Sequence, residues 1–83
     1  MAGPDALPYG DSVQYPTLVF GNTRLYIHNP DRHYSGKISV WVPGHTEDVL
    51  VNSGQTNHIE RDWRGTNIFV SNIGGPTLTV WTA

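Results

Sequence analysis

The 83-residue chain has no cysteine and only five lysines and arginines. The missing thiols exclude disulfides, thiolate metal sites and cysteine nucleophiles, and they leave the redox compartment open. The formal net charge of −2 argues against a partner bound through its phosphates, because nucleic-acid-binding proteins carry a basic patch or stripe. We therefore expect no nucleic acid among the partners of this protein.

Long apolar runs are missing too, since the longest contain three residues, as in "LVF" (18–20). A membrane-spanning helix needs about 20, so we expect no transmembrane segment. The first residues, "MAGPDALPYG", have neither the basic nor the apolar region of a secretory signal peptide. The localisation stays open between the cytoplasm and secretion by a non-standard route, and the initiating Met1 favours a complete short gene.

Catalytic motifs are absent as well. There is no G-x-S-x-G elbow, and "NIGGPT" (72–77) lacks the spacing and the lysine of a phosphate-binding loop. A chain this short rarely encloses a cleft in which two carboxylates could hydrolyse a glycosidic bond. We expect a protein that is not an enzyme and needs no cofactor.

Histidines are the only residues that suggest a metal. His28 and His33, with Asp31 between them, offer two nitrogens and an oxygen. Their spacing matches no zinc pattern, and turn chemistry alone explains a loop with this composition. We predict no metal site.

What the sequence does contain is typical of β-structure: short runs rich in Val, Ile, Thr and aromatic residues, separated by Gly, Pro and Asn turns. We expect an all-β fold, a small antiparallel β-sandwich or barrel of about seven short strands. Residues 1–16 hold three prolines and no periodicity, which predicts an irregular N-terminal arm before a single domain at 17–83. The expected strands are 17–20, 24–29, 37–42, 48–51, 56–60, 66–72 and 77–82.

Turn residues predict how these strands pair. "FGNT" (20–23) favours a two-residue hairpin loop, "VPGH" (42–45) a type II turn, and "VNSGQ" (51–55) a three-residue loop that sets Val49 opposite Asn57. For "SNIGGPTL" (71–78) two loops are possible. A three-residue loop sets Val70 opposite Val80, whereas a two-residue loop shifts the register by one and turns every side chain to the other face; we favour the three-residue loop.

Strand parity then separates an aliphatic face from an aromatic one. The aromatic face combines small polar residues with four large aromatic ones, Tyr26, Trp41, Phe69 and Trp81. The aliphatic face is the predicted core and comprises Leu25, Ile27, Ile38, Val40, Val42, Val49, Val51, Ile59, Ile68, Val70, Leu78 and Val80.

The aromatic set has two interpretations. As a second apolar layer it would be covered by the N-terminal arm, by the other sheet or by an identical subunit. Cover by an identical subunit would make the protein a structural or assembly component whose aromatic face is a homo-oligomer interface. As an exposed platform it would bind a glycan, a glycolipid or a membrane surface, because aromatic rings stack on apolar sugar faces and suit a lipid headgroup boundary. Our first hypothesis is the exposed platform, which would make the protein a lectin-like or small membrane-binding defence protein.

The charged segment "HIERDWRGTN" (58–67) is a second candidate site. We expect Trp63 and Arg64, with Asp62 beside them, to project from a loop at one end of the domain and to contact a ligand. The alternative is a solvated loop with weak local ion pairs.

The pattern "LYIHN...GKISVWV...VLVNSGQT..I...WRGTNIFVSN", from Leu25 to about Asn72, resembles small β-sandwich proteins of the aegerolysin kind. That resemblance implies lipid or glycan recognition. It carries over no functional residue.

Overall fold

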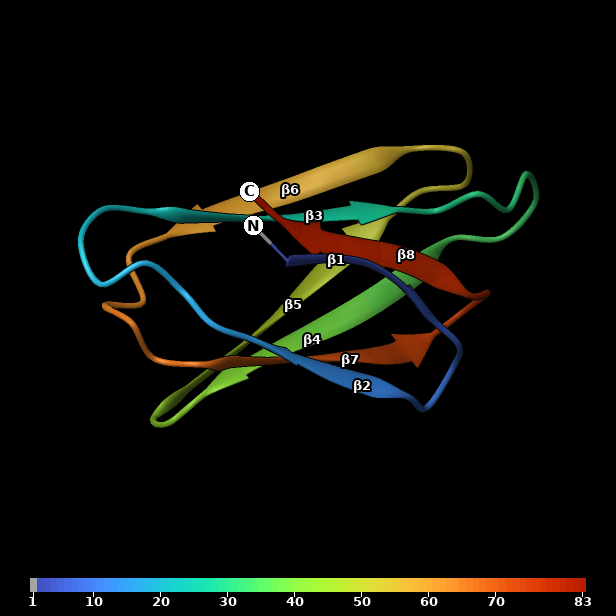
Figure 1. Ribbon diagram of the computed structural model, residues 1–83. Helices are drawn as coiled ribbons and strands as arrows, with labels where there is room; N and C mark the ends of the chain where they lie inside the picture. The colour runs from blue at the N-terminus through green and yellow to red at the C-terminus, as the bar shows by residue number, and fades with distance from the viewer. Residues whose placement is uncertain (1) are drawn as a thin grey trace.

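Residues 2–83, which the computed structural model describes, form two four-stranded antiparallel sheets packed face to face (Figure 1). Sheet A has the strand order β1-β8-β3-β6 and sheet B the order β2-β7-β4-β5. This order is that of an eight-stranded jelly roll. The predicted all-β sandwich is confirmed, and the alternative of a closed barrel is not. The strands are β1 (Ala2–Leu7), β2 (Ser12–Tyr15), β3 (Thr23–His28), β4 (Gly36–Val42), β5 (His45–Val51), β6 (Thr56–Arg61), β7 (Ile68–Gly74) and β8 (Leu78–Thr82).

The core between the sheets is the predicted aliphatic face. Every member of that face is buried except Val42, which is partly buried and packs against the others. Alternation along each strand is the cause, because one parity turns inward and the other toward solvent. Leu7, Tyr15 and Trp63 complete the core, and sequence parity did not identify them.

The expected irregular arm differs from the structure, in which residues 2–15 supply one edge strand to each sheet. β1 pairs with β8 and β2 pairs with β7. The β1–β8 ladder shifts register between Ala2 and Asp5, and this irregularity at Gly3 and Pro4 hid the strand from pattern analysis. Strands β1 and β2 are gained and the expected strand at 17–20 does not form, so the sandwich has eight strands rather than seven.

Only one of the four expected hairpins forms. Val42 pairs with His45, and Gly44, at a φ of 83°, makes the turn that its sequence predicted. Residues 17–20 are a loop and not a strand, so the hairpin at "FGNT" is wrong.

The other two expected hairpins are wrong because the chain crosses from one sheet to the other at both places. β5 lies in sheet B and β6 in sheet A. Likewise, β7 lies in sheet B and β8 in sheet A. Asn57 therefore pairs with Ile27, and Val80 pairs with Asp5 and Ile27. A turn sequence shows that the chain reverses, but not which sheet the next strand joins.

Three connections lie together at one end of the elongated molecule (Figure 1): the β2–β3 loop (16–22), the β4–β5 turn (43–44) and the β6–β7 loop (62–67). We call this the tip end. The long axis measures 38 Å against 21 and 16 Å for the others. Residues 2–83 contain no helix, and therefore no helix that could cross a membrane.

Candidate functional site

The four predicted platform aromatics divide between the two outer faces of the sandwich. Trp41 (β4) and Phe69 (β7) lie on sheet B, whereas Tyr26 (β3) and Trp81 (β8) lie on sheet A. Their shared outward parity was identified correctly. They do not form one surface, because the outer faces of a two-layer sandwich point in opposite directions.

On sheet B, a row of directly opposed residues crosses all four strands: Gln14, Phe69, Trp41 and Thr46. The Trp41 and Phe69 ring centroids are 5.3 Å apart with an interplanar angle of 63°, the edge-to-face geometry that aromatic pairs prefer. Trp41 is 45% exposed and Phe69 37% exposed. Ring surface on this face is therefore accessible to a ligand.

A row of small polar side chains runs beside the aromatic one, two residues further along each strand: Ser12, Ser71, Ser39 and Asp48. The Ser12 and Ser71 hydroxyl oxygens are 2.7 Å apart. Residues separated by two positions share a face of a strand at a spacing of roughly 7 Å, so hydroxyl and carboxylate groups adjoin the rings. We call the two rows together the aromatic–serine face.

On sheet A, a shorter aromatic row joins His58, Tyr26 and Trp81. Tyr26 and Trp81 are nearly parallel, at 7°, with ring centroids 5.4 Å apart, and Tyr26 also contacts the His58 ring at 5.5 Å. Both Tyr26 and Trp81 are half-buried. These rings use much of their surface on one another.

Strand β1 closes against the far side of Trp81. A Cβ atom placed on Gly3, whose φ is 84°, would lie 3.0 Å from the Cβ of Trp81, so only glycine allows this approach. What remains open on sheet A is a shallow depression of about 370 Å³ lined by Pro4, His28, Thr79 and Trp81.

The β6–β7 loop differs from the expectation in one respect. Trp63 does not project: it is 9% exposed and belongs to the core. The cause is a tight turn, in which Asp62 Oδ1 accepts the Arg64 amide proton at 3.1 Å and the Trp63 carbonyl accepts that of Thr66 at 2.9 Å. This turn directs the indole inward, and Asp62 and Arg64 stay exposed.

The structure nevertheless brings Asp62, Trp63 and Arg64 together. With Val42, Pro43 and Thr66 they line an open pocket of about 270 Å³ at the tip end. Arg64 has a φ of 53°, a left-handed conformation that is uncommon outside glycine, asparagine and aspartate.

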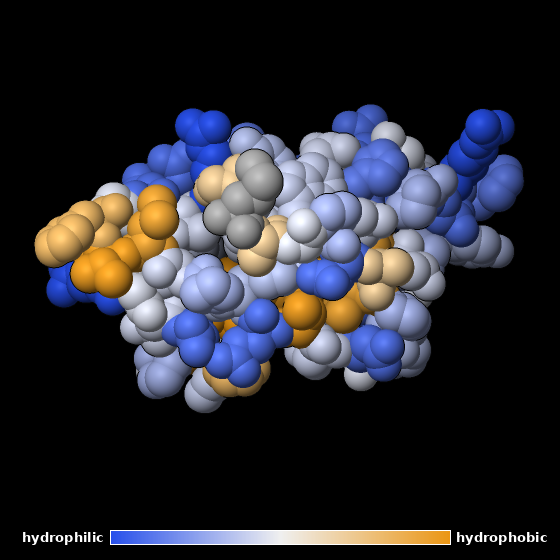
Figure 2. Space-filling view, viewed as in Figure 1, coloured by the Kyte–Doolittle hydropathy of each residue, from blue (hydrophilic) through white to orange (hydrophobic). Residues whose placement is uncertain are grey.

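Sequence reasoning missed a third feature, the β2–β3 loop. Its three large apolar residues, Leu18, Val19 and Phe20, are 53%, 64% and 90% exposed, and Figure 2 shows hydrophobic side chains gathered at this end of the molecule. We call these three residues the apolar tip. The available signal was the run "LVF" between Pro16 and Gly21, which does not alternate as an exposed strand would.

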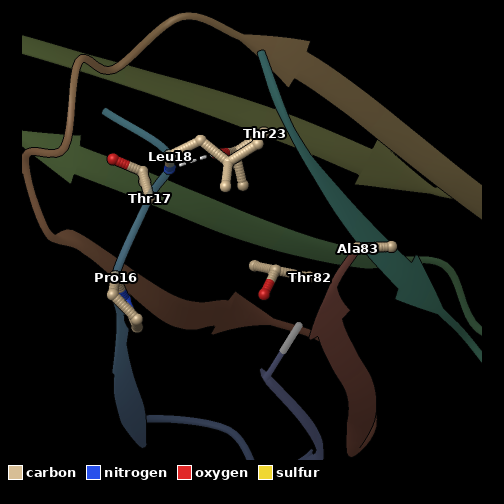
Figure 3. A pocket seen from close by; sticks show the side chains of 6 residues that line it. All are labelled: Pro16, Thr17, Leu18, Thr23, Thr82 and Ala83. Atoms are coloured by element: carbon tan, nitrogen blue, oxygen red, sulfur yellow. Dashed lines mark hydrogen bonds between the residues drawn. The ribbon is translucent and has the colours of Figure 1, made fainter. Parts of the chain in front are cut away.

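A small hollow of about 130 Å³ lies beneath the apolar tip, between Pro16 and the C-terminal residues (Figure 3). Its hydroxyl groups already have partners: Thr23 accepts the Leu18 amide proton at 2.9 Å, Thr82 accepts that of Ala2 at 3.1 Å, and Thr17 donates to the Thr66 carbonyl at 2.8 Å. The hollow is small, and each of its hydroxyls already takes part in the hydrogen bonding of the fold, so it is a poor ligand site.

Charges at the tip end are balanced. Arg24 Nε lies 2.7 Å from Glu60 Oε1 and Arg61 Nη2 lies 3.0 Å from Glu47 Oε1. The hydrogen bond from Arg24, followed by that from Asn22, lowers the pKa of Glu60, which keeps this carboxylate ionised. Within residues 2–83, Arg64 takes part in no ion pair.

The predicted histidine loop is explained by local hydrogen bonds. Asp31 Oδ1 accepts the amide protons of His33 at 2.7 Å and Tyr34 at 2.9 Å, and these bonds lower the pKa of Asp31. His28 Nδ1 lies 2.9 Å from the Thr56 hydroxyl. No group of three potential metal ligands occurs among the residues that the structure describes.

Comparison with known proteins adds no relative: no family model, no curated protein and no solved structure matches the chain. Jelly rolls occur in capsid proteins and in lectins alike, so the fold alone does not decide the function.

Proposed function

We propose that the protein is a non-enzymatic binding module that recognises a glycan, free or carried by a glycolipid, through the aromatic–serine face of sheet B. A sugar ring has an apolar face of C–H groups and a rim of hydroxyls. On sheet B the exposed Trp41 and Phe69 rings offer a stacking surface to the apolar face of the sugar. The neighbouring serine hydroxyls and Asp48 can form hydrogen bonds with the hydroxyls of its rim.

The observation that carries the proposal is the adjacency of these two rows on one exposed face. Sheet A supports it less well, because Tyr26 and Trp81 stack on each other and are half-buried. An open face of this kind suits the surface of a glycan chain or a terminal sugar more than a small molecule, which needs a concave pocket.

A glycan array probed with the native protein and with Trp41→Ala tests the proposal. We expect discrete binding by the native protein and a loss of about tenfold or more in apparent affinity for the variant, because the loss of one stacked ring is on the order of 1.4 kcal/mol. Trp41→Phe keeps a ring and should retain part of the binding. Leu50→Ala, an exposed aliphatic position on the same face, is the matched control and should bind normally.

The proposal fails if the native protein binds no glycan, or if Trp41→Ala binds the same glycans as strongly. Thermal unfolding of each variant distinguishes a lost site from a lost fold, since the loss of about 1 kcal/mol expected for Trp41→Ala should lower the melting temperature by several degrees and leave a cooperative transition.

A second candidate function is assembly of identical copies through sheet B. The observation that favours it is that two aliphatic residues, Leu50 and Ile73, are exposed there at 56% and 42%, whereas a sugar site has little use for aliphatic side chains. Light scattering after gel filtration tests it. A native oligomer that Leu50→Ser or Ile73→Ser converts to a monomer would support assembly, and a native monomer at high concentration would exclude it.

A further inference from the structure

The apolar tip is held rigidly at its base. Leu18 donates its amide proton to the buried Thr23 hydroxyl at 2.9 Å (Figure 3), and its carbonyl accepts that of Gly65 at 2.9 Å. Thr17 adds the bond to the Thr66 carbonyl at 2.8 Å. The base of the loop is thus fastened to β3 and to the β6–β7 loop, although its side chains point to solvent.

Packing supports the same arrangement. A Cβ atom on Gly65 would lie 3.1 Å from Cγ2 of Val19, so the glycine lets the two loops approach closely. Phe20, by contrast, is 90% exposed and contributes little to this packing. Three consecutive apolar side chains held in water are unfavourable in the free protein, because the exposed apolar surface forgoes the stabilisation that its burial would give. Such a patch marks an interaction site.

The position of the tip indicates the kind of partner. It lies at the narrow end of a molecule 38 Å long and 21 by 16 Å across, where Figure 2 shows hydrophobic side chains protruding. A protruding apolar group at a narrow end can enter a fluid hydrocarbon layer without a matching pocket. Phenylalanine and leucine are among the side chains that favour the boundary between headgroups and acyl chains.

Charge indicates the kind of lipid. Binding to anionic lipid needs a cluster of lysines and arginines, but Arg24 and Arg61 are neutralised by Glu60 and Glu47, Asp62 lies beside Arg64, and the whole chain carries −2. A mixture of guanidinium and carboxylate groups around an apolar centre matches a zwitterionic headgroup, which carries one charge of each sign.

We infer that Leu18, Val19 and Phe20 insert into a phosphatidylcholine bilayer, with the charged side chains of the tip end at the level of its headgroups. Arg64, which makes no ion pair within residues 2–83, is placed to meet the lipid phosphate. This inference concerns a different surface from the aromatic–serine face and does not depend on glycan binding.

Flotation with vesicles of pure phosphatidylcholine, which contain no sugar, is the test. We expect the native protein to float with the vesicles and Phe20→Ser to reduce the partition coefficient by about tenfold or more, the usual scale for one large apolar side chain. Tyr34→Ser is the matched control, because Tyr34 is also highly exposed but lies in the β3–β4 loop at the other end. It should change the partition coefficient by less than about twofold.

The chain has no cysteine, so a single Phe20→Cys can be labelled with an environment-sensitive fluorophore. On addition of vesicles we expect a blue shift and quenching by spin-labelled acyl chains, neither of which should occur with the label at Gln55→Cys, in the β5–β6 loop. Both substituted positions are exposed, so the fold should tolerate them.

Three results would overturn the inference. The first is a native protein that stays unbound at all phosphatidylcholine concentrations. The second is binding that requires anionic lipid and disappears in salt, which would indicate electrostatic adsorption. The third is an oligomer that Phe20→Ser dissociates, since the tip would then be a contact between copies of the chain.

Discussion

The Tyr15 hydroxyl of β2 donates to Asp5 Oδ2 of β1 at 2.5 Å and lies 3.0 Å from the Val80 carbonyl of β8. It joins the edge strand of sheet B to sheet A, and its ring is buried. We expect Tyr15→Phe to lower the free energy of unfolding by about 1 to 3 kcal/mol, because it removes the donor and leaves the Asp5 side chain without this hydrogen bond. Urea unfolding followed by fluorescence measures the change.

Tyr9→Phe is the control for this substitution, since Tyr9 is highly exposed and loss of its hydroxyl should change stability by less than about 0.5 kcal/mol. Equal stability of the native protein and Tyr15→Phe would show that the β1–β2 segment is not held by this bond.

The same contact predicts loss of stability in alkaline solution. Burial, followed by the hydrogen bond to Asp5 and its charge, raises the pKa of Tyr15 above its ordinary value of 10.0. Below pH 10 the phenol is neutral in both the folded and unfolded states. Above it the unfolded chain ionises first, so the free energy of unfolding falls as pH rises.

Urea midpoints measured from pH 8 to pH 11.5 should therefore decline more steeply above pH 10 for the native protein than for Tyr15→Phe. Parallel curves for the two proteins would contradict a raised pKa at Tyr15.

Gly75 follows β7 in the connection to β8 and should tolerate no side chain. Its φ is 87°, and a Cβ atom would collide with the Ser35 carbonyl oxygen and lie 2.9 Å from the Cα of Gly36. We expect Gly75→Ala to cost roughly 3 kcal/mol, from backbone strain and overpacking together. Gly44→Ala shares the positive φ, at 83°, but meets no atom within 4 Å, so it should cost only about 1 kcal/mol. Equal losses in urea unfolding would mean that the contact with residues 35 and 36 does not matter.

Substitution by alanine should destabilise the fold much more at Trp63 than at Trp41. Trp63 is a core residue, and Trp63→Ala is expected to cost about 3 to 5 kcal/mol, most of the stability of a small domain. Trp63→Phe, which keeps an aromatic ring in the core, should cost less and is the variant expected to remain folded. Trp41→Ala should cost about 1 kcal/mol, mainly the contact with Phe69. A well-folded Trp63→Ala would instead return Trp63 to the set of ligand-binding candidates.

Sequence parity predicted the core well because it depends on a local property, the alternation of strand side chains. It also identified Tyr26, Trp41, Phe69 and Trp81 as outward-facing. It did not show that β7 and β8 belong to different sheets, since a Gly-Gly-Pro turn is compatible with a hairpin and with a crossing. One predicted surface therefore became two.

The features at the tip end were less predictable for a related reason. The inward direction of Trp63 depends on a turn closed by Asp62 and Thr66, in a loop without periodicity. The run "LVF" favoured a strand by composition, and only tertiary hydrogen bonds from Thr17, Leu18 and Gly65 hold it as an exposed loop.

Acrylamide quenching of tryptophan fluorescence, compared between the native protein and Trp41→Phe, tests most directly whether sheet B presents a free binding face. Trp41 is 45% exposed, whereas Trp63 is buried and Trp81 half-buried. We expect a readily quenched, red-shifted component in the native protein that disappears in Trp41→Phe and that is protected when a glycan selected on the array is added. A native protein whose emission is shielded throughout, with no difference between the two proteins, would contradict a free aromatic–serine face.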